Sequence, residues 1–148
     1  MNRDQRTIVM VEDNPADVES VRRGLDRTEI PAELSVLNDG VEAYELLETG
    51  ELLEGIRPDL ILLDLNVPGL DGREFLRAFE EVSTGDRIPL VVLTTSRNRD
   101  DVEYAYENGA NAYVVKPSEA DQFLDFIESI FKYWFKTLDD QLSQGPQP

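Results

Sequence analysis

The stretch that decides the fold reads Leu60-Ile61-Leu62-Leu63-Asp64-Leu65-Asn66-Val67-Pro68-Gly69. Its four leading apolar residues indicate a strand that is buried on both faces, as in a parallel sheet. The Pro-Gly pair marks a turn soon after that strand. Asp64 therefore stands at the mouth of a buried strand, where a carboxylate is placed for chemistry rather than for solubility.

Two other strand-like runs also end in charged residues. The run Thr7-Ile8-Val9-Met10-Val11 is followed by Glu12 and Asp13, and the run Ala112-Tyr113-Val114-Val115 is followed by Lys116. The carboxyl ends of parallel strands share one edge of a sheet, so three acids and one lysine converge there. Such a set predicts a divalent-metal and phosphoryl site.

Short β-branched runs alternate with longer amphipathic segments along the chain. This alternation predicts an α/β fold, a doubly wound parallel sheet with helices on both faces. We expect strands at about 7–11, 33–37, 59–63, 90–94 and 112–115. We expect helices that start near 15 and 41, and helices over about 73–82, 99–108 and 119–139. Residues 49–58 fit a surface loop or an extra turn.

Local signals refine these helices. Asp13 or Asn14 is the expected N-cap of the first helix, and Ser118, followed by Glu119, is the expected cap of the last. Apolar residues on the second helix are Val41, Tyr44, Leu46 and Leu47.

The 148 residues predict one domain. We expect an N-terminal tail over 1–6, a domain over 7–139 that includes an extended last helix, and a disordered tail over 140–148. The last helix carries two apolar stripes. One is Phe123, Ile127, Ile130 and Trp134, and the other is Leu124, Phe131, Phe135 and Leu138. One stripe suffices for docking on the sheet, and the second either packs inside the molecule or forms a dimer or partner surface.

Composition excludes several classes of function. The chain has no cysteine and no histidine, so it lacks thiol chemistry and cannot itself be a phosphohistidine donor. Its net charge of −17 argues against a nucleic-acid partner. No apolar stretch approaches a membrane span of roughly 20 residues, so we expect a cytoplasmic protein without membrane contact. Arginine outnumbers lysine by 11 to 3 and the acids are scattered, which suggests a halophilic protein.

Glu12, Asp13 and Asp64 would repel one another at one edge unless a cation lay among them. Oxygen ligands without His or Cys favour Mg²⁺. The alternative is that Glu12 and Asp13 only interact with the dipole of the first helix. Asp64 can act as a nucleophile toward phosphorus and form an acyl phosphate, with charge neutralised by the metal and Lys116.

Hydroxyl groups at the end of the fourth strand can join this site. Thr94 is the candidate donor, but the sequence alone does not distinguish it from Thr95 or Ser96. Tyr113 is either a core aromatic residue or a mobile reporter of the site. A cis Lys116–Pro117 bond would fix the turn that aims the ammonium group, and the sequence leaves cis and trans open.

These residues together resemble the receiver domain of bacterial and archaeal two-component response regulators. The resemblance covers about 7–131. Its motifs are Val-Glu-Asp-Asn-Pro, Leu-Leu-Asp-Leu-Asn-Val-Pro-Gly-Leu-Asp-Gly, Val-Leu-Thr-Thr-Ser and Tyr-Val-Val-Lys-Pro. It implies a flavodoxin-like (βα)5 fold with strand order 2-1-3-4-5.

The resemblance also implies a role for each motif residue. It makes Asp64 the acceptor of a phosphoryl group, with Thr94 and Lys116 in contact with that group and Tyr113 turning inward with Thr94 on activation. It implies that Mg²⁺ is held by Asp13, Asp64 and the carbonyl of Asn66, and by Glu12 mainly through water.

The resemblance is narrower to small stand-alone receivers that pair with phytochrome-type and other sensor kinases. It implies a sensor histidine kinase or a phosphotransfer protein as the partner. Output would then pass through protein contacts on the surface of the fourth helix, fifth strand and fifth helix, and a homodimer through that surface is one such use.

Three competing functions remain. A phosphohydrolase with an aspartyl nucleophile usually has a second acid two residues later, and Asn66 occupies that position. A flavin-binding protein would need a phosphate-binding loop where Glu12 and Asp13 would repel phosphate. A phosphorylation-independent adaptor is disfavoured because the full set of acids, Thr94 and Lys116 is intact.

Overall fold

The computed structural model describes residues 5–83 and 87–136. Five parallel strands form one sheet in the order β2-β1-β3-β4-β5. The strands are β1 (Arg6–Val11), β2 (Ala32–Leu37), β3 (Leu60–Leu63), β4 (Leu90–Thr94) and β5 (Ala112–Val115). This confirms the doubly wound, flavodoxin-like order that the resemblance implied.

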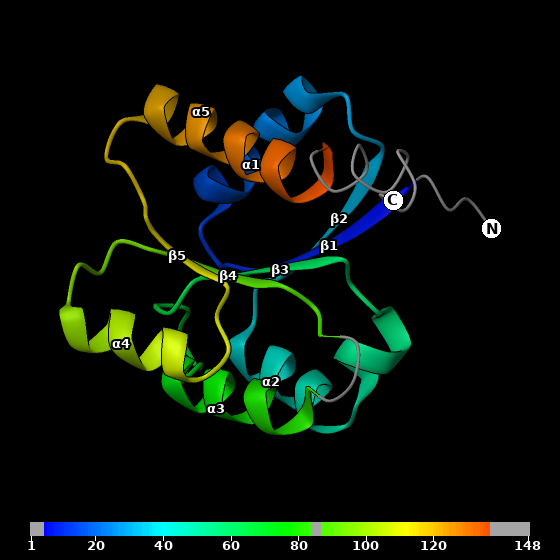
Figure 1. The fold of residues 1–148 in the computed structure, drawn as a ribbon, viewed down its shortest axis with the longest axis vertical. Coiled ribbons are helices and arrows are strands. Elements are labelled where there is room, and N and C mark those ends of the chain that lie inside the picture. Colours follow the sequence, from blue (N-terminus) through cyan, green and yellow to red (C-terminus); the bar gives the residue numbers. More distant parts are fainter. Residues whose placement is uncertain (1–4, 84–86, 137–148) are drawn as a thin grey trace, which may run out of the picture.

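Helices cover both faces of the sheet (Figure 1). On one face lie α1 (Pro15–Thr28) and α5 (Ala120–Phe131), and on the other lie α2 (Gly40–Glu48), α3 (Gly72–Val82) and α4 (Arg99–Glu107). No helix in the described part of the chain is long and apolar enough to cross a lipid bilayer.

Alternate residues of the central strands build two separate cores. In β3, Ile61 and Leu63 face the α2–α4 side, and Leu60 and Leu62 face the α1–α5 side. All four are fully buried. The period of two in a strand sends successive side chains to opposite faces, so a strand that is covered on both faces must be apolar throughout.

Helix α1 begins at Pro15, as expected. Of the two N-caps that the sequence left open, Asn14 is the cap and accepts a hydrogen bond from the Ala16 N–H. Helix α5 differs, because its N-cap is Glu119 rather than Ser118 and no side chain caps it. The helix begins at Ala120, so Ser118 lies one residue before the cap position.

Helix α2 buries Ala43 and Leu47, while Val41 is 53% exposed. Val41 lies in the first turn, and the helix there faces the loop after β3 rather than the sheet. The segment 49–58 contains a π-helical turn, η1 (Glu51–Ile56), with Leu52 fully buried. This agrees with the expected extra turn.

The two stripes predicted on the last helix do not separate in the structure. The buried set mixes members of both stripes and consists of Phe123, Leu124, Ile127, Phe131 and Phe135. A π-helical turn, η2 (Lys132–Lys136), follows α5 and changes the angular spacing that an α-helix would give. Leu138, the predicted tail over 140–148 and the first four residues of the tail predicted over 1–6 lie outside the described residues. Arg6, which was assigned to that N-terminal tail, begins β1.

Candidate functional site

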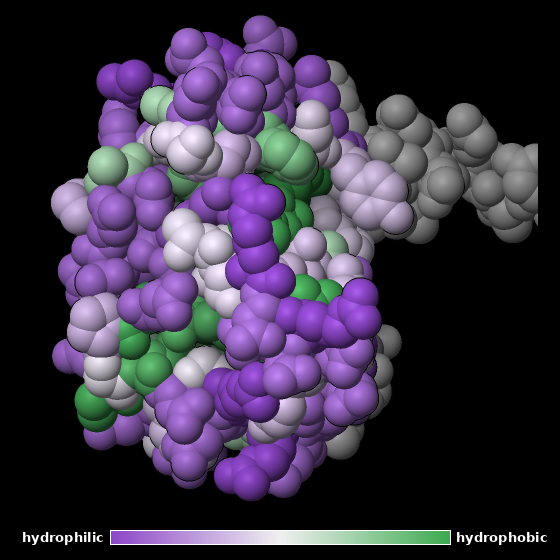
Figure 2. Space-filling view, turned by 90° about the vertical axis from the view of Figure 1, so that its left-hand side faces the viewer, coloured by the Kyte–Doolittle hydropathy of each residue, from purple (hydrophilic) through white to green (hydrophobic). Residues whose placement is uncertain are grey.

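The strand register brings the acidic residues together at the carboxyl edge of the sheet. Val11 pairs with Leu63, so Glu12 and Asp64 follow their strands side by side. The Asp64 N–H donates to the Val11 carbonyl over 3.1 Å, which continues the ladder to the site itself. Both side chains are buried, Glu12 at 1% and Asp64 at 7% exposure. The face that carries these strand ends is largely hydrophilic (Figure 2).

Lys116 reaches the acids from the end of β5. Its ammonium donates to Glu12 Oε1 over 2.5 Å and to Asp64 Oδ2 over 2.8 Å. The side chain is 6% exposed, so the ion pairs are shielded from water. The described residues contain no cis peptide bond, so the Lys116–Pro117 bond is trans and the turn is made without the cis form that the sequence left open.

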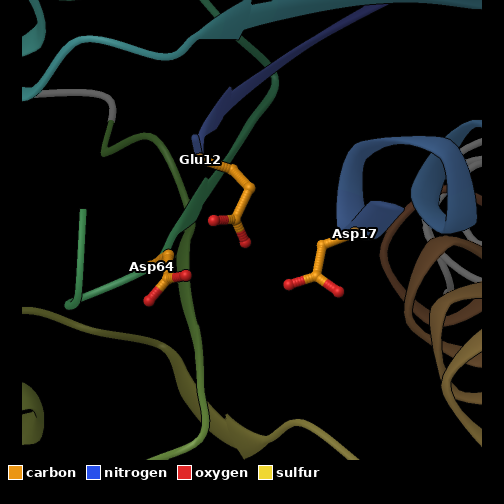
Figure 3. Close-up of side chains that lie close together, drawn as sticks. All are labelled: Glu12, Asp17 and Asp64. Atoms are coloured by element: carbon orange, nitrogen blue, oxygen red, sulfur yellow. The ribbon is translucent and has the colours of Figure 1, made fainter. Parts of the chain in front are cut away.

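A third acid, Asp17, completes this cluster. Its Oδ2 accepts from the Lys116 ammonium over 2.7 Å, and its carboxylate points into the same space as those of Glu12 and Asp64 (Figure 3). Asp17 lies in the first turn of α1. The sequence analysis missed it, because an acid in a first helical turn is also explained by the helix dipole.

Asp13 does not join the cluster. Among the described residues, the acids whose oxygens lie within 4.8 Å of one another are Glu12, Asp17 and Asp64. Asp13 is exposed, and its backbone N–H donates to Glu12 Oε2 over 3.1 Å. The structure thus brings together Glu12 and Asp64 of the expected metal ligands, while the Asp13 carboxylate stands apart from them.

The loop after β3 and the end of β4 meet through hydroxyl and amide groups. Asn66 Nδ2 donates to Thr94 Oγ1 over 3.0 Å, and the Asn66 N–H donates to Asp64 Oδ1 over 2.9 Å. Thr94 is fully buried and Thr95 is exposed. Of the two threonines that the sequence could not distinguish, Thr94 is the one that faces the site.

Tyr113 lies between the core and the solvent. Its hydroxyl donates to the Ser96 carbonyl over 3.0 Å, and its ring packs against the core on the α2–α4 side. Burial raises the pKa of Tyr113, so the hydroxyl stays protonated as a donor. The side chain is therefore at once a core aromatic residue and a contact to the β4–α4 loop.

A groove of about 550 Å³ lies beside Asn66 and is bordered by the β3–α3 loop and by Arg73 and Asp101. Arg73 Nη2 donates to Asp101 over 2.9 Å, and Ser96 Oγ donates to the same carboxylate over 2.7 Å. These two donors, the Ser96 hydroxyl first, lower the pKa of Asp101. The groove is linked to the buried site through Ser96 and Thr94.

Burial and close acids shift the ionisation of the cluster. Burial, together with the neighbouring Asp64, raises the pKa of Glu12 to about 7. Burial alone would lower the pKa of Lys116, but its hydrogen bonds to Asp17, Asp64 and Glu12 raise that pKa well above the ordinary value. Lys116 therefore remains a cation at any physiological pH.

The donor set fits a hard dication. All the clustered ligand atoms are carboxylate oxygens, which Mg²⁺ and Mn²⁺ accept. When all groups are ionised, three carboxylates and one ammonium sum to −3 + 1 = −2, the charge that one dication neutralises. Lys116 alone leaves the cluster negative.

Comparison with known proteins agrees with this geometry. Residues 8–128 match the family model described as response regulator receiver domain. The chain is 40% identical over 134 residues to response regulator Rcp1 of Synechocystis sp., covering 90% of this chain and 91% of that protein. It is 35% identical to the probable methanogenesis regulatory protein FilR2 of Methanothrix harundinacea, covering 86% of this chain and 82% of that one.

Solved structures show the same architecture. The phosphorylated cyanobacterial phytochrome response regulator RcpA is 40% identical with a TM-score of 0.80, covering 90% of this chain and 96% of that one. The Mn²⁺-bound form of Rcp1 is 39% identical with a TM-score of 0.78, covering 89% and 96%. Fold, motif order and clustered acids agree with a family match over most of the chain, and the chain belongs to the response regulator receiver domain family.

Proposed function

We propose that this receiver, a signalling switch, accepts a phosphoryl group on Asp64 in a reaction that depends on a divalent cation and that the protein itself catalyses. The observation that carries the proposal is the Lys116 ammonium, buried and bonded to Asp64 over 2.8 Å. A buried cation at a nucleophilic carboxylate is suited to neutralise the charge of an incoming phosphoryl group.

The donor in this transfer is a phosphohistidine. A carboxylate oxygen of Asp64 forms a bond to phosphorus while the bond between phosphorus and the imidazole nitrogen of the donor breaks. The electron pair of that bond remains on the donor imidazole. Lys116 holds one phosphoryl oxygen and the hydroxyl of Thr94 donates to another. The chain contains no histidine, so the phosphohistidine belongs to another molecule.

Mg²⁺ is the cation we propose, held by Asp64, Asp13 and the Asn66 carbonyl, and by Glu12 mainly through water. It would neutralise charge on the phosphoryl oxygens. The Mn²⁺-bound form of Rcp1 supports a divalent cation in a protein of this kind. The exposed Asp13 carboxylate would have to turn inward, because it lies outside the present cluster.

We propose a sensor histidine kinase, or a phosphotransfer protein, as the source of the phosphoryl group. Similarity to RcpA, described as a phytochrome response regulator, supports a phytochrome-type kinase.

Tyr113 would report phosphorylation to the surface, since it already contacts Ser96, two residues beyond Thr94.

The α4–β5–α5 surface is the proposed site of output and of homodimer formation. Phe126 of α5 and Tyr133 of η2, two of the most exposed large apolar side chains among the described residues, line one groove there, and Tyr106 is exposed on α4. A groove of about 600 Å³ between β5 and α5 is lined by Val114, Phe126, Ile130 and Trp134, among others. Clustered exposed apolar groups mark interaction surfaces.

One experiment tests the acceptor and one tests the surface. After incubation with acetyl phosphate and Mg²⁺, borohydride reduction and peptide mapping should place the modification at Asp64; modification elsewhere contradicts the proposal, and no modification favours a phosphorylation-independent adaptor. In sedimentation experiments, Phe126→Ser should weaken self-association while Val82→Ser, which changes an exposed residue of α3, should not. A wild type that stays monomeric with and without beryllofluoride would exclude the homodimer.

A further inference from the structure

Three carboxylates share the single ammonium group of Lys116. The acceptors are Glu12 at 2.5 Å, Asp17 at 2.7 Å and Asp64 at 2.8 Å. An ammonium has three N–H donors, so these bonds use all of them. Two acceptors follow strand ends, and the third, Asp17, comes from a helix. The proposed transfer assigns a role to Glu12 and Asp64 but none to Asp17.

Asp17 is held in place by the start of α1. Asn14 caps the helix through the Ala16 N–H over 2.9 Å, and Pro15 sets the first helical position. The Asp17 carboxylate lies in the first turn, where the helix dipole favours a negative charge, and its side chain is only 22% exposed. The lysine ammonium is therefore clamped between the sheet and α1.

We propose that Asp17 is a positioning residue which, together with Glu12, fixes the Lys116 ammonium so that its remaining N–H points at Asp64. This inference rests on the proposed function of Asp64. When a phosphoryl group replaces the free carboxylate, that same N–H takes a phosphoryl oxygen, and the other two bonds stay in place.

The physical reason is the flexibility of lysine. Its ammonium is a strongly hydrated charge on a stem with four carbons, so it adopts many positions unless its donors are engaged. A cation that is already fixed needs no reorganisation when charge arrives. Without Asp17, one donor lacks an acceptor on the α1 side, and the ammonium has only acceptors at the strand ends.

A double-mutant cycle tests this role with beryllofluoride, a phosphoryl analogue, at saturating Mg²⁺. We expect Asp17→Ala to weaken beryllofluoride binding about tenfold, the size expected for loss of a hydrogen bond between charged groups. Asp17→Asn keeps an acceptor and should weaken binding less. In a Lys116→Met background, Asp17→Ala should have no further effect, because its partner is gone.

Glu19→Gln is the matched control, since it also removes one negative charge from α1. Glu19 is 58% exposed and pairs with Arg23, so this variant should bind beryllofluoride like the wild type. Thermal melts by circular dichroism identify any variant that fails to fold, and Asp17→Asn keeps the test open if Asp17→Ala does not fold.

A second readout does not depend on phosphoryl chemistry. Lys116 is one of three lysines, so the ¹⁵N–¹H signal of its ammonium can be assigned by substitution. The buried, fully bonded ammonium should give a slowly exchanging signal in the wild type, and Asp17→Ala should broaden or remove it. If Lys116→Met binds beryllofluoride too weakly for the cycle, this signal alone tests whether Asp17 fixes the Lys116 ammonium.

Three results would overturn the inference and leave the proposed function intact. Equal beryllofluoride binding by wild type and Asp17→Ala would make Asp17 an ordinary acid of a first helical turn. A loss that persists in the Lys116→Met background, accompanied by weaker Mg²⁺ binding, would make Asp17 a metal ligand instead. An unchanged ammonium signal in Asp17→Ala would show that Asp17 does not fix the Lys116 ammonium. Failure of the wild type itself to bind beryllofluoride would overturn the proposed function, and this inference with it.

Discussion

The side-chain amide of Asn66 donates a hydrogen bond to the hydroxyl of Thr94 over 3.0 Å and ties the loop after β3 to the end of β4. The same hydroxyl oxygen accepts from the Ser96 N–H over 3.3 Å. The Thr94 hydroxyl thus accepts from the β3–α3 loop and from the β4–α4 loop. Movement of the Thr94 side chain would change the hydrogen bonds to both loops.

Replacing Thr94 with valine keeps the shape of the side chain and removes the hydroxyl. We expect Thr94→Val to weaken beryllofluoride binding at saturating Mg²⁺ by roughly fivefold to tenfold, since one hydrogen bond to a charged group is lost. Isothermal titration calorimetry measures this. Thr95→Val is the control, because Thr95 is exposed and should bind like the wild type. Equal losses in both variants would contradict the assignment of Thr94.

Binding of Mg²⁺ should release protons near neutral pH. Burial and Asp64 raise the pKa of Glu12 to about 7, and a bound dication favours the ionised carboxylate. The affinity for Mg²⁺ should therefore increase as the pH rises toward 7 and level off above it. Calorimetry in buffers of different ionisation enthalpy counts the protons, and Glu12→Gln should release none at this pH. A wild type that binds Mg²⁺ without proton release contradicts the shift.

The same shift sets the sign of the pH dependence of stability in the metal-free protein. The folded pKa of Glu12 lies above its ordinary value of 4.5, so the folded form holds a proton that the unfolded form loses between pH 4.5 and about 7. The free energy of unfolding should fall as the pH rises through that window, by an amount on the order of 3 kcal/mol for this group. Urea titrations of wild type and Glu12→Gln should differ in this slope.

The strands and the strand-end residues could be predicted because their signals are local. A fully buried strand must be apolar throughout, and the residue that follows it lies at the sheet edge whatever the helices do. Glu12, Asp64 and Lys116 directly follow strands, and Thr94 is the last residue of β4. Asp17 does not, because whether a helical side chain reaches the site depends on how α1 crosses the sheet.

The remaining differences also come from packing. The exposure of Val41 depends on how α2 lies against the β3–α3 loop. The buried face of α5 takes members of both stripes already before the π-helical turn, at Phe123, Leu124, Ile127 and Phe131. Hydrophobic periodicity shows which residues are apolar, and the rotation of the helix on the sheet decides which of them are buried. The position of the Asp13 carboxylate depends on a side-chain rotamer, which the motif does not specify.

Gly24 allows α1 and α5 to approach closely. A Cβ at this position would lie 2.5 Å from Cγ2 of Ile127. Glycine to alanine inside a helix usually stabilises a protein by up to about 1 kcal/mol, but here overpacking should reverse the sign. We expect Gly24→Ala to lower the free energy of unfolding by roughly 1–3 kcal/mol in urea titrations. A pairing with Ile127→Leu, which removes the Cγ2 branch and keeps the volume, should recover part of the loss. A stabilised Gly24→Ala would contradict the close packing.

Asp101 should hold the β4–α4 loop. It accepts from Ser96 Oγ and from Arg73, whose guanidinium also lies 4.9 Å from the centre of the Tyr104 ring. Asp101→Asn should speed amide hydrogen exchange in residues 95–98, while the free energy of unfolding changes by less than about 1 kcal/mol because Arg73 is half-exposed. Glu19→Gln breaks an exposed pair elsewhere and should leave this loop unchanged. Unchanged exchange in Asp101→Asn would show that the ion pair does not restrain the loop.

Every role proposed for this site depends on transfer of the phosphoryl group to Asp64. The most direct measurement is the intact mass of wild type and Asp64→Asn after incubation with acetyl phosphate and Mg²⁺ in molar KCl, with a parallel sample in which a chelator removes the metal. We predict one added phosphoryl group on the wild type only, and only with Mg²⁺. An adduct on folded Asp64→Asn, or no adduct on a wild type that binds Mg²⁺ and does not bind beryllofluoride, would show that Asp64 is not a phosphoryl acceptor.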